Sequence, residues 1–192
     1  MAVSMHDCLA EHIAAAQQMS KILPAVEKAS SAICTALAAG GRVFTFGNGG
    51  SAADAQHFAA EMIGHYRADR QPLPAIALTT NSSVLTCIGN DYDFTEIFAR
   101  QVQGLARAGD IVVGFSTSGN SLNVCKGLLA AQALGACTIA FTGISGGRAA
   151  EIADIALLAP AAGTARIQEL HVLMIHMICD QIEAWAVRTA TG

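Results

Sequence analysis

Short apolar runs alternate with longer segments of mixed polarity over most of the chain. Five runs are rich in β-branched, aromatic and other apolar residues, and the segments between them are long enough for helices. The predicted strands are 43–46, 75–78, 111–115, 137–141 and 155–158. This alternation predicts an α/β fold in which a five-stranded parallel sheet lies between two helical layers, α/β/α, joined by crossover helices.

Helical patterns occupy both ends of the chain. Residues 4–23 and 24–39 predict a pair of helices, with Pro24 opening the second and Gly40 closing it. Residues 164–188 predict one long helix that packs in the core or between subunits. Its apolar residues recur at helical spacing: Ile167, Leu170, Leu173, Met174, Met177, Ile178 and Ile182.

No repeat, low-complexity stretch or long linker divides the 192 residues, which suit one domain with a sizeable core. We therefore predict one domain over 1–192, made of an N-terminal helical pair (1–39) and an α/β core (42–192). Hydrophobic residues make up 53% of the chain and charged ones 14%, so a monomer would have little polar surface. A homo-oligomer that uses the helical pair is expected.

Several classes of protein are disfavoured by composition. The chain has no run of about 18 apolar residues, so no membrane-spanning helix and no membrane partner are predicted. A net charge of −4 without a basic cluster argues against a nucleic-acid binder. The start lacks the pattern of a signal peptide, which predicts a cytoplasmic protein. The scattered cysteines form no CxxC pair and are expected to be reduced thiols: Cys8, Cys34, Cys87, Cys125, Cys137 and Cys179.

A glycine-rich loop follows the first predicted strand and leads directly into a helix. It reads Gly47, Asn48, Gly49, Gly50, Ser51. Glycines let the backbone approach an anion closely, and the free amides of a helix start favour negative charge, so a phosphate or sugar site is predicted. The spacing also fits a loose GxGxxA. A dinucleotide is nevertheless disfavoured, because no acidic residue ends the second predicted strand.

A second polar loop follows the third predicted strand and again opens a helix. Ser116, Thr117, Ser118 and Ser121 concentrate four hydroxyl groups there, without a lysine or arginine. A helix N-cap would need only one hydroxyl. The excess predicts a neutral cradle that binds a phosphate monoester by hydrogen bonds.

His57 and Glu61 are four residues apart and share one face of the helix that follows the glycine loop. They are able to ligate one metal ion together, although a histidine in such a pair is more often a buried histidine than a ligand. The final helix adds further groups able to bind metal, namely Gln168, Glu169, His171 and His176. Spacing alone leaves a zinc site undecided.

Four segments together resemble one enzyme family, across nearly the whole chain. They are residues 46–61, 88–92 (Ile-Gly-Asn-Asp-Tyr), 116–121 and 164–171, the last followed by His176. They resemble the sedoheptulose-7-phosphate isomerase family, also called phosphoheptose isomerases, within the wider group of sugar isomerase (SIS) domains. The two loops alone indicate only the wider group. Glu61, Gln168 and His176 make the resemblance specific.

The resemblance implies particular site residues. It implies one Zn²⁺ per subunit, held by His57, Glu61, Gln168 and His176. It implies substrate contacts from Asn48, Gly49, Gly50, Ser51, Glu61, Asn90, Asp91, Ser116, Thr117, Ser118, Ser121 and Gln168. It further implies a homotetramer with active sites between subunits. Asn81 is a local departure, because an acidic residue is expected there.

The implied reaction converts sedoheptulose 7-phosphate, a ketose, into D-glycero-D-manno-heptose 7-phosphate, an aldose, for lipopolysaccharide or capsule synthesis. A proton moves between adjacent carbons through an enediol, which needs a base at carbon and an acid at oxygen. On this interpretation Glu61 is the base and His176 the acid, while zinc polarises the carbonyl.

The spacing of two implied ligands raises a geometric difficulty. Gln168 and His176 are eight residues apart, which is about 12 Å along a helix and about 80° around it. Either both side chains stretch fully toward one ion, or helices of different subunits build the site together. We hypothesise the shared site, in which mixing Glu61→Ala and His176→Ala proteins restores activity.

Two other functions remain open. One is a non-catalytic SIS-domain binding protein, such as the relative that associates with the replication initiator DnaA, or a phosphosugar sensor. A pure binding protein has no physical need for Glu61, Gln168 and His176 together. The other is an isomerase of a hexose or pentose phosphate.

Overall fold

The structure, a computed structural model, describes residues 4–190. The predicted domain limits, residues 1 and 192, lie outside the described residues. So do residues 1–3, which begin the segment that was compared with a signal peptide. All five predicted strands form, and they make one parallel sheet in the order β2-β1-β3-β4-β5. Their bounds are β1 (Val43–Gly47), β2 (Ala75–Ala77), β3 (Ile111–Ser116), β4 (Cys137–Gly143) and β5 (Ile155–Ala159). The predicted α/β/α fold is confirmed.

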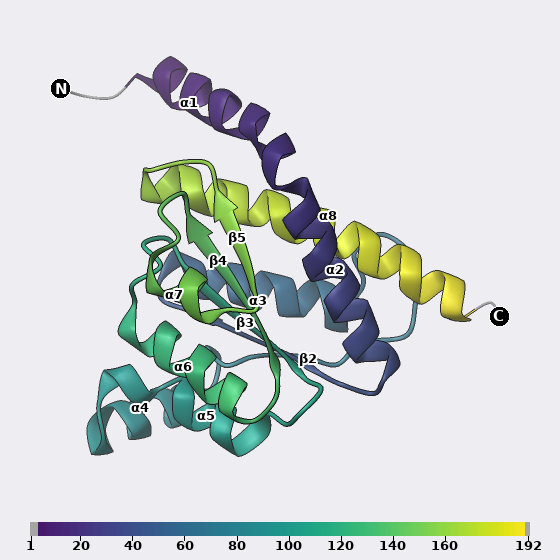
Figure 1. The fold of residues 1–192 in the computed structure, drawn as a ribbon, viewed down its shortest axis with the longest axis vertical. Helices are drawn as coiled ribbons and strands as arrows, with labels where there is room; N and C mark the ends of the chain where they lie inside the picture. Colours follow the sequence, from purple (N-terminus) through teal and green to yellow (C-terminus); the bar gives the residue numbers. More distant parts are fainter. Residues whose placement is uncertain (1–3, 191–192) are drawn as a thin grey trace.

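Helices cover both faces of the sheet (Figure 1). One face carries α2 (Leu23–Ala38), α3 (Gly50–Ile63) and α8 (Thr164–Ala190). The other carries α4 (Ser82–Asp91), α5 (Ala99–Leu105), α6 (Leu122–Ala133) and α7 (Gly147–Ile152), with a short 3-10 turn, η2 (Phe94–Glu96).

Strict alternation along the strands produces two separate cores. Val43, Ile111 and Val113 point to the core beneath α2, α3 and α8, whereas Phe44 and Val112 point to the core beneath α5 and α6. All five are 0–1% exposed. Because successive strand residues face opposite sides, strands covered on both faces are apolar throughout, as the sequence pattern indicated.

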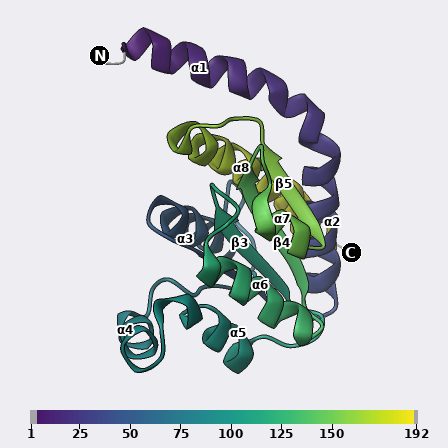
Figure 2. The same cartoon turned by 60° about the vertical axis from the view of Figure 1, so that its left-hand side comes forward.

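The first predicted helix is interrupted. The structure has α1 (Met5–Gln17), then a 3-10 segment η1 (Gln18–Ile22), instead of one helix over 4–23. The tighter turn buries Met19, which is 2% exposed, and directs the chain into α2. Helix α1 has no buried residue and lies at the edge of the molecule (Figure 2), where His12 Nδ1 contacts Glu169 Oε2 of α8 at 2.6 Å.

The long C-terminal helix is confirmed, and it packs as a core helix. Ile167, Leu170, Met174, Ile178 and Ile182 of the predicted stripe are 0–4% exposed against the sheet. Its segment Thr164–Thr189 is long and apolar enough to span a membrane, with a mean hydropathy of 1.2. Half of the 18-residue window on which this hydropathy is measured is buried inside the protein, which is typical of a helix in a protein core.

The six cysteines are free thiols. Among them Cys125 and Cys179 are buried and Cys87 is exposed, and the predicted reduced state is confirmed. Burial, assisted by the nearby Glu61 carboxylate, raises the pKa of Cys179 to about 12, which makes this thiol unreactive.

The strand order reverses between β1 and β3, because β1 is followed in sequence by β2 on one side and β3 pairs on its other side. In open parallel sheets the carboxyl ends of strands at such a reversal form a ligand crevice. The glycine loop follows β1, and the serine loop, residues 116–121, follows β3. The fold therefore places both predicted anion loops at the reversal.

Candidate active site

Helices α3 and α8 lie side by side on one face of the sheet and run in the same direction (Figure 1). The start of α3 meets Gln168 near the start of α8. One to two turns later His57 meets His176. We call this line of contacts the α3–α8 seam, residues 50–61 against 168–176. It brings together groups that are more than 100 residues apart in sequence.

Three predicted ligands converge at the far end of the seam. His57 Nε2 is 3.0 Å from Glu61 Oε1 and 3.4 Å from His176 Nε2. One ligand atom from each of the three residues lies within 4.8 Å of the other two. The four-residue spacing of His57 and Glu61 places them on one helix face, as predicted, and α8 supplies the third group.

This convergence corrects the shared-site hypothesis. Glu61 and His176 meet within one chain, so helices of different subunits are not needed to join them. The hypothesis failed because it assumed that Gln168 and His176 must reach the same point. In the structure they occupy different positions along the seam, since α3 runs beside α8 and offers each a separate neighbour.

The three residues suit a catalytic zinc ion. Two imidazole nitrogens and a carboxylate are a ligand set that zinc enzymes use when a fourth position is left for water or substrate. Two Nε2 atoms face one another at 3.4 Å, an arrangement satisfied either by a proton on one of them or by a shared ion. The side chains of His57 and Glu61 are 35% and 21% exposed, so a small ligand has access.

A buried ion pair holds the end of the seam beside this cluster. Glu183 of α8 accepts hydrogen bonds from the backbone N–H groups of Tyr66 and Arg67 at 3.0–3.1 Å. Burial raises the pKa of Glu183, but those backbone donors and Arg70 outweigh it and hold the pKa below its usual range. The Arg70 guanidinium donates to the carbonyl oxygen of Glu61 at 2.7 Å. The anchored loop also places the ring of Tyr66 against His176, with centroids 5.6 Å apart and the ring planes tilted by 31°.

Gln168 lies at the opposite end of the seam, against the glycine loop. A Cβ atom added to Gly50 would be 2.4 Å from Gln168 Nε2. Position 50 therefore has to be glycine if the amide of Gln168 is to keep its position against the glycine loop. Gly49, at φ +56°, makes the turn into the helix. The predicted contact group of Gln168 and the glycine loop is thus assembled by one chain.

Two asparagines join the glycine loop to the serine loop. Asn48 Nδ2 donates to Asn123 Oδ1 and Asn123 Nδ2 donates to Asn48 Oδ1, both at 2.8 Å. Asn123 is 3% exposed in the first turn of α6. The reciprocal bonds bridge the strand-order reversal, so the two predicted anion loops form one continuous rim.

The serine loop keeps hydroxyl and amide groups close together. Ser116 Oγ donates to Ser121 Oγ at 3.1 Å, and Ser118 Oγ accepts from the backbone N–H of Asn120 at 3.1 Å. Gly119, at φ +67°, approaches the carbonyl oxygen of Gly146 so closely that no Cβ fits there. Thr117 accepts from the backbone N–H of Gly143 at 3.1 Å. These contacts fix a hydrogen-bonding cradle for an anion.

Asn90 and Asp91 do not join these groups. They end α4, where Asn90 Nδ2 donates to Asp91 Oδ1 at 2.7 Å and both are exposed. Hydrogen bonds from Asn90 and then Cys87 hold the pKa of Asp91 below its usual range. Asn81, the departure from the family pattern, caps α4 by accepting from the backbone N–H of Val84 at 3.1 Å. An aspartate would cap this helix equally well.

Sequence reasoning missed several residues that support the site. Asn123, Tyr66 and Glu183 were not singled out, because their partners are distant in sequence. Asp54 carried a signal, since it is a lone acid among small residues of the helix that bears His57 and Glu61. Its side chain is buried beside His171, at 3.9 Å.

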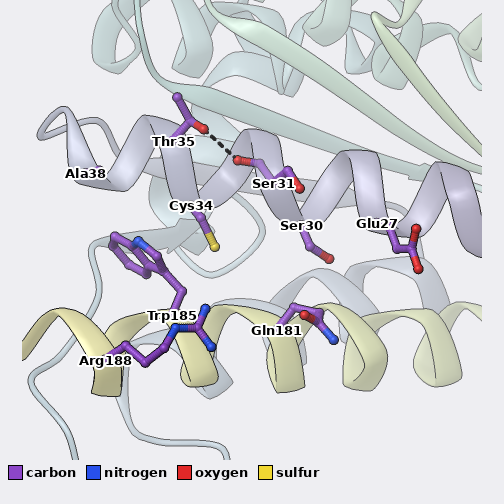
Figure 3. A pocket seen from close by; sticks show the side chains of 9 residues that line it. All are labelled: Glu27, Ser30, Ser31, Cys34, Thr35, Ala38, Gln181, Trp185 and Arg188. Atoms are coloured by element: carbon purple, nitrogen blue, oxygen red, sulfur yellow. Dashed lines mark hydrogen bonds between the residues drawn. The ribbon is translucent and has the colours of Figure 1, made fainter.

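A groove lies elsewhere, between α2 and the end of α8 (Figure 3). Its volume is about 680 Å³, and none of the predicted site residues lines it. The lining residues are Glu27, Ser30, Ser31, Cys34, Thr35, Ala38, Gln181, Trp185 and Arg188. They lack the histidine and carboxylate cluster needed for enediol chemistry, so size does not identify the active site.

Comparisons with known proteins identify the family of the chain. The SIS domain family matches residues 9–143. The phosphoheptose isomerase of Aquifex aeolicus is 55% identical over 79% of this chain and 79% of its own, and that of Helicobacter hepaticus 47% over 90% and 88%. The solved phosphoheptose isomerase of Neisseria gonorrhoeae superimposes with a TM-score of 0.87, at 47% identity over 92% of this chain and 95% of that one. The chain belongs to the phosphoheptose isomerase family of SIS-domain proteins.

Proposed function

We propose that the chain interconverts sedoheptulose 7-phosphate and D-glycero-D-manno-heptose 7-phosphate through an enediol. The observation that carries the proposal is the placement of Glu61 and His176 at one end of the α3–α8 seam, with the phosphate-binding loops at the other. One chain thus offers a proton-transfer pair and an anchor for the distant phosphate. The arrangement suits a sugar phosphate whose reacting carbons lie far from its phosphoryl group.

Glu61 acts as the base and His176 as the acid. The carboxylate of Glu61 takes the proton from C1 of the ketose and returns it at C2. His176 passes a proton between the two oxygens, so each atom keeps its bond count through the enediol. The neighbouring ring of Tyr66 and the anchored carbonyl of Glu61 hold both groups in place.

His57, Glu61 and His176 would hold one zinc ion per subunit, through Nε2 of each histidine, and the proton transfer by His176 would then use Nδ1. The bound ion would polarise the carbonyl and stabilise the enediolate. A carboxylate has two oxygens, so ligation by one leaves the other able to accept a proton. Gln168 as a fourth ligand stays a prediction, because its amide lies against Gly50.

The loops orient the substrate. Ser116, Thr117, Ser118 and Ser121 bind the phosphate, while Asn48, Gly49, Gly50, Ser51 and Gln168 contact the sugar. This anchoring holds the reacting carbons near Glu61 and supplies positioning instead of chemistry. Asn90 and Asp91, exposed on α4, would reach a substrate only from another subunit, which agrees with sites that lie between subunits.

Assembly into a homotetramer would use surfaces that one chain leaves open. Met5, Leu9 and Ile13 form an exposed apolar stripe along α1, at 89%, 58% and 47% exposure. The α2–α8 groove offers a second concave surface on the same helical face (Figure 3). The helical pair 1–39 serves this assembly, and residues 42–192 form the catalytic core. The enzyme works in the cytoplasm and supplies heptose for lipopolysaccharide or capsule.

Replacing either proton-transfer residue is expected to stop turnover. Glu61→Gln and His176→Ala should lower kcat for sedoheptulose 7-phosphate by about 10²- to 10⁴-fold, because each removes one proton-transfer group. Steady-state kinetics by NMR of the heptose phosphates measures this. Glu151→Gln and His6→Ala alter exposed residues of the same types and should keep full activity. A wild-type kcat in the Glu61→Gln variant would show that Glu61 is not the catalytic base.

The metal is tested by removal and return. A chelator should abolish turnover, and added zinc should restore it, because the carbonyl would lose its polarising group. His57→Ala should lower the zinc content per chain, read by elemental analysis. His65→Ala, an exposed histidine outside the cluster, should leave the zinc content unchanged. Full activity after complete removal of metal would contradict the proposed zinc.

The Gly50 contact tests the position of Gln168. Gly50→Ala should lower kcat/KM by about 10- to 100-fold, because the new methyl group displaces the amide of Gln168. The melting temperature should hardly change, since a flexible side chain gives way. Gly104→Ala in α5 meets open space and serves as the control. Gly50→Ala combined with Gln168→Ala should be no worse than Gln168→Ala alone, and an additive loss would oppose this explanation.

A further inference from the structure

A pair of side-chain amides at the strand-order reversal includes one residue that the reaction described above does not use. Asn48 follows β1 and is half-buried, whereas Asn123, in the first turn of α6, is 3% exposed. Nδ2 of each residue donates to Oδ1 of the other at 2.8 Å. Asn123 therefore presents almost no surface to a ligand, and its amide serves the neighbouring side chain of Asn48.

A backbone amide determines which way both side chains are turned. The backbone N–H of Val124 donates to Asn123 Oδ1 at 2.9 Å. A backbone N–H can only donate, so the atom that it meets has to be the oxygen of the Asn123 amide. In the reversed orientation Nδ2 would face this N–H, and two donors would meet. The same order is passed on to Asn48, whose oxygen has to face the Nδ2 group of Asn123.

The pairing leaves Asn48 with a defined set of groups for a ligand. A carboxamide has two N–H donors and two lone pairs on its oxygen, and the pair with Asn123 uses one of each. One N–H and one lone pair of Asn48 remain. A hydroxyl group both donates and accepts, so one sugar hydroxyl can accept from Nδ2 while a second donates to Oδ1. An Asn48 amide free to rotate would offer these two groups in either order.

The backbones of the two loops are held by contacts of their own. The carbonyl oxygen of Asn48 accepts from the backbone N–H of Ser51 at 3.0 Å, which closes the turn of the glycine loop. In the serine loop, the carbonyl oxygen of Thr117 accepts from the backbone N–H of Gly143 at 3.1 Å. Loss of the Asn123 amide would therefore free the side chain of Asn48 and leave both loop backbones in place.

We propose that Asn123 is a positioning residue, which fixes the rotation of the Asn48 amide so that one N–H and one lone pair face the hydroxyl groups of the sugar. The proposal rests on the proposed function for the identity of that sugar. Asn123 does not touch the substrate itself, because it is buried and its oxygen already accepts two hydrogen bonds. The backbone N–H of Val124, the Asn123 amide and the Asn48 amide thus transmit one orientation from the helix to the ligand.

Two substitutions of Asn123 separate its hydrogen bonding from its shape. Asn123→Leu removes both hydrogen bonds to Asn48, whereas Asn123→Asp keeps the shape and the acceptor but removes the donor. Both should lower kcat/KM for sedoheptulose 7-phosphate by about 10- to 100-fold, because either change lets the Asn48 amide turn away. Asn123→Asp is assayed at alkaline pH, where the new carboxyl group is ionised. A wild-type kcat/KM in that variant would overturn the proposal.

A double variant tests whether Asn123 acts through Asn48. Asn48→Ala alone should lower kcat/KM about as much as Asn123→Leu. Adding Asn123→Leu to Asn48→Ala should change kcat/KM by less than about threefold, because the side chain that Asn123 orients is already gone. Losses that multiply in the double variant would show that Asn123 acts by another route and would contradict the positioning role.

Phosphate binding distinguishes the orientation of one side chain from loosening of the whole rim. By calorimetry, inorganic phosphate should bind Asn123→Leu with a dissociation constant within about threefold of the wild type, because the serine loop keeps its own contacts. Thr138→Val is the matched control, because it removes a buried hydrogen bond at the opposite edge of the sheet, from Thr138 Oγ1 to Asp154 Oδ2 at 2.8 Å. It should lower the melting temperature and leave kcat/KM unchanged. A loss of phosphate affinity as large as the loss of kcat/KM, or equal losses of kcat/KM in Asn123→Leu and Thr138→Val, would reduce Asn123 to a structural contact.

An NMR measurement keeps this test independent of the proposed reaction. In protein labelled with ¹⁵N-asparagine, one side-chain N–H of Asn48 should have the chemical shift of a hydrogen-bonded amide in the wild type and in Thr138→Val, because it donates to Asn123. In Asn123→Leu it should move to the value of a solvent-exposed amide. If the wild type fails to turn over sedoheptulose 7-phosphate but shows these signals, the proposed substrate is wrong and the orientation of Asn48 by Asn123 stands. Identical Asn48 signals in the wild type and in Asn123→Leu would refute the pairing itself.

Discussion

The parallel packing of α3 on α8 is the constraint on which the site depends. The two helices begin at residues 50 and 164, and nothing local in the sequence joins them. Contacts at two levels fix their alignment: Gly50 with Gln168, and His57 with His176. Below them, Glu183 and Arg70 fasten the loop after α3 to the same helix. A change in helix register would therefore disturb the sugar contacts and the proton-transfer groups together.

The sheet determines where the second half of the site lies. Because the strand order reverses between β1 and β3, the loops after these strands open side by side, and Asn48 and Asn123 bond them together. This rim binds through amides and hydroxyls, without a lysine or arginine in either loop. On the proposed function, a neutral rim would hold a phosphate monoester by hydrogen bonds, without a strong field at the distant carbons where Glu61 would act as the base. Anchoring and chemistry are thus separated along one pair of helices.

The sequence was sufficient to predict the fold, and it singled out His57, Glu61 and His176, which the structure brings together. The short apolar runs of the strands and the stripe of α8 are local patterns, and the spacing of His57 and Glu61 is a property of a single helix. Packing between distant elements was not readable: the sequence suggested that Glu61 and His176 come from different subunits, because it could not show α3 beside α8. For the same reason, the sequence analysis did not single out Asn123, Tyr66 or the placement of Asp54 beside His171. The change from α-helix to 3-10 helix between α1 and η1 was not predicted, because the burial of Met19 depends on tertiary packing.

Mixed oligomers test the central claim, that one chain supplies both Glu61 and His176 to each site. Glu61→Ala and His176→Ala proteins would be denatured together, refolded so that chains mix, and assayed on sedoheptulose 7-phosphate beside each variant refolded alone. Affinity tags of two kinds would isolate the oligomers that contain both chains. The account predicts no recovery, because every site in a mixed oligomer lacks one of the two groups. Recovery to a substantial fraction of wild-type kcat would show that the two residues act across subunits and would contradict the account.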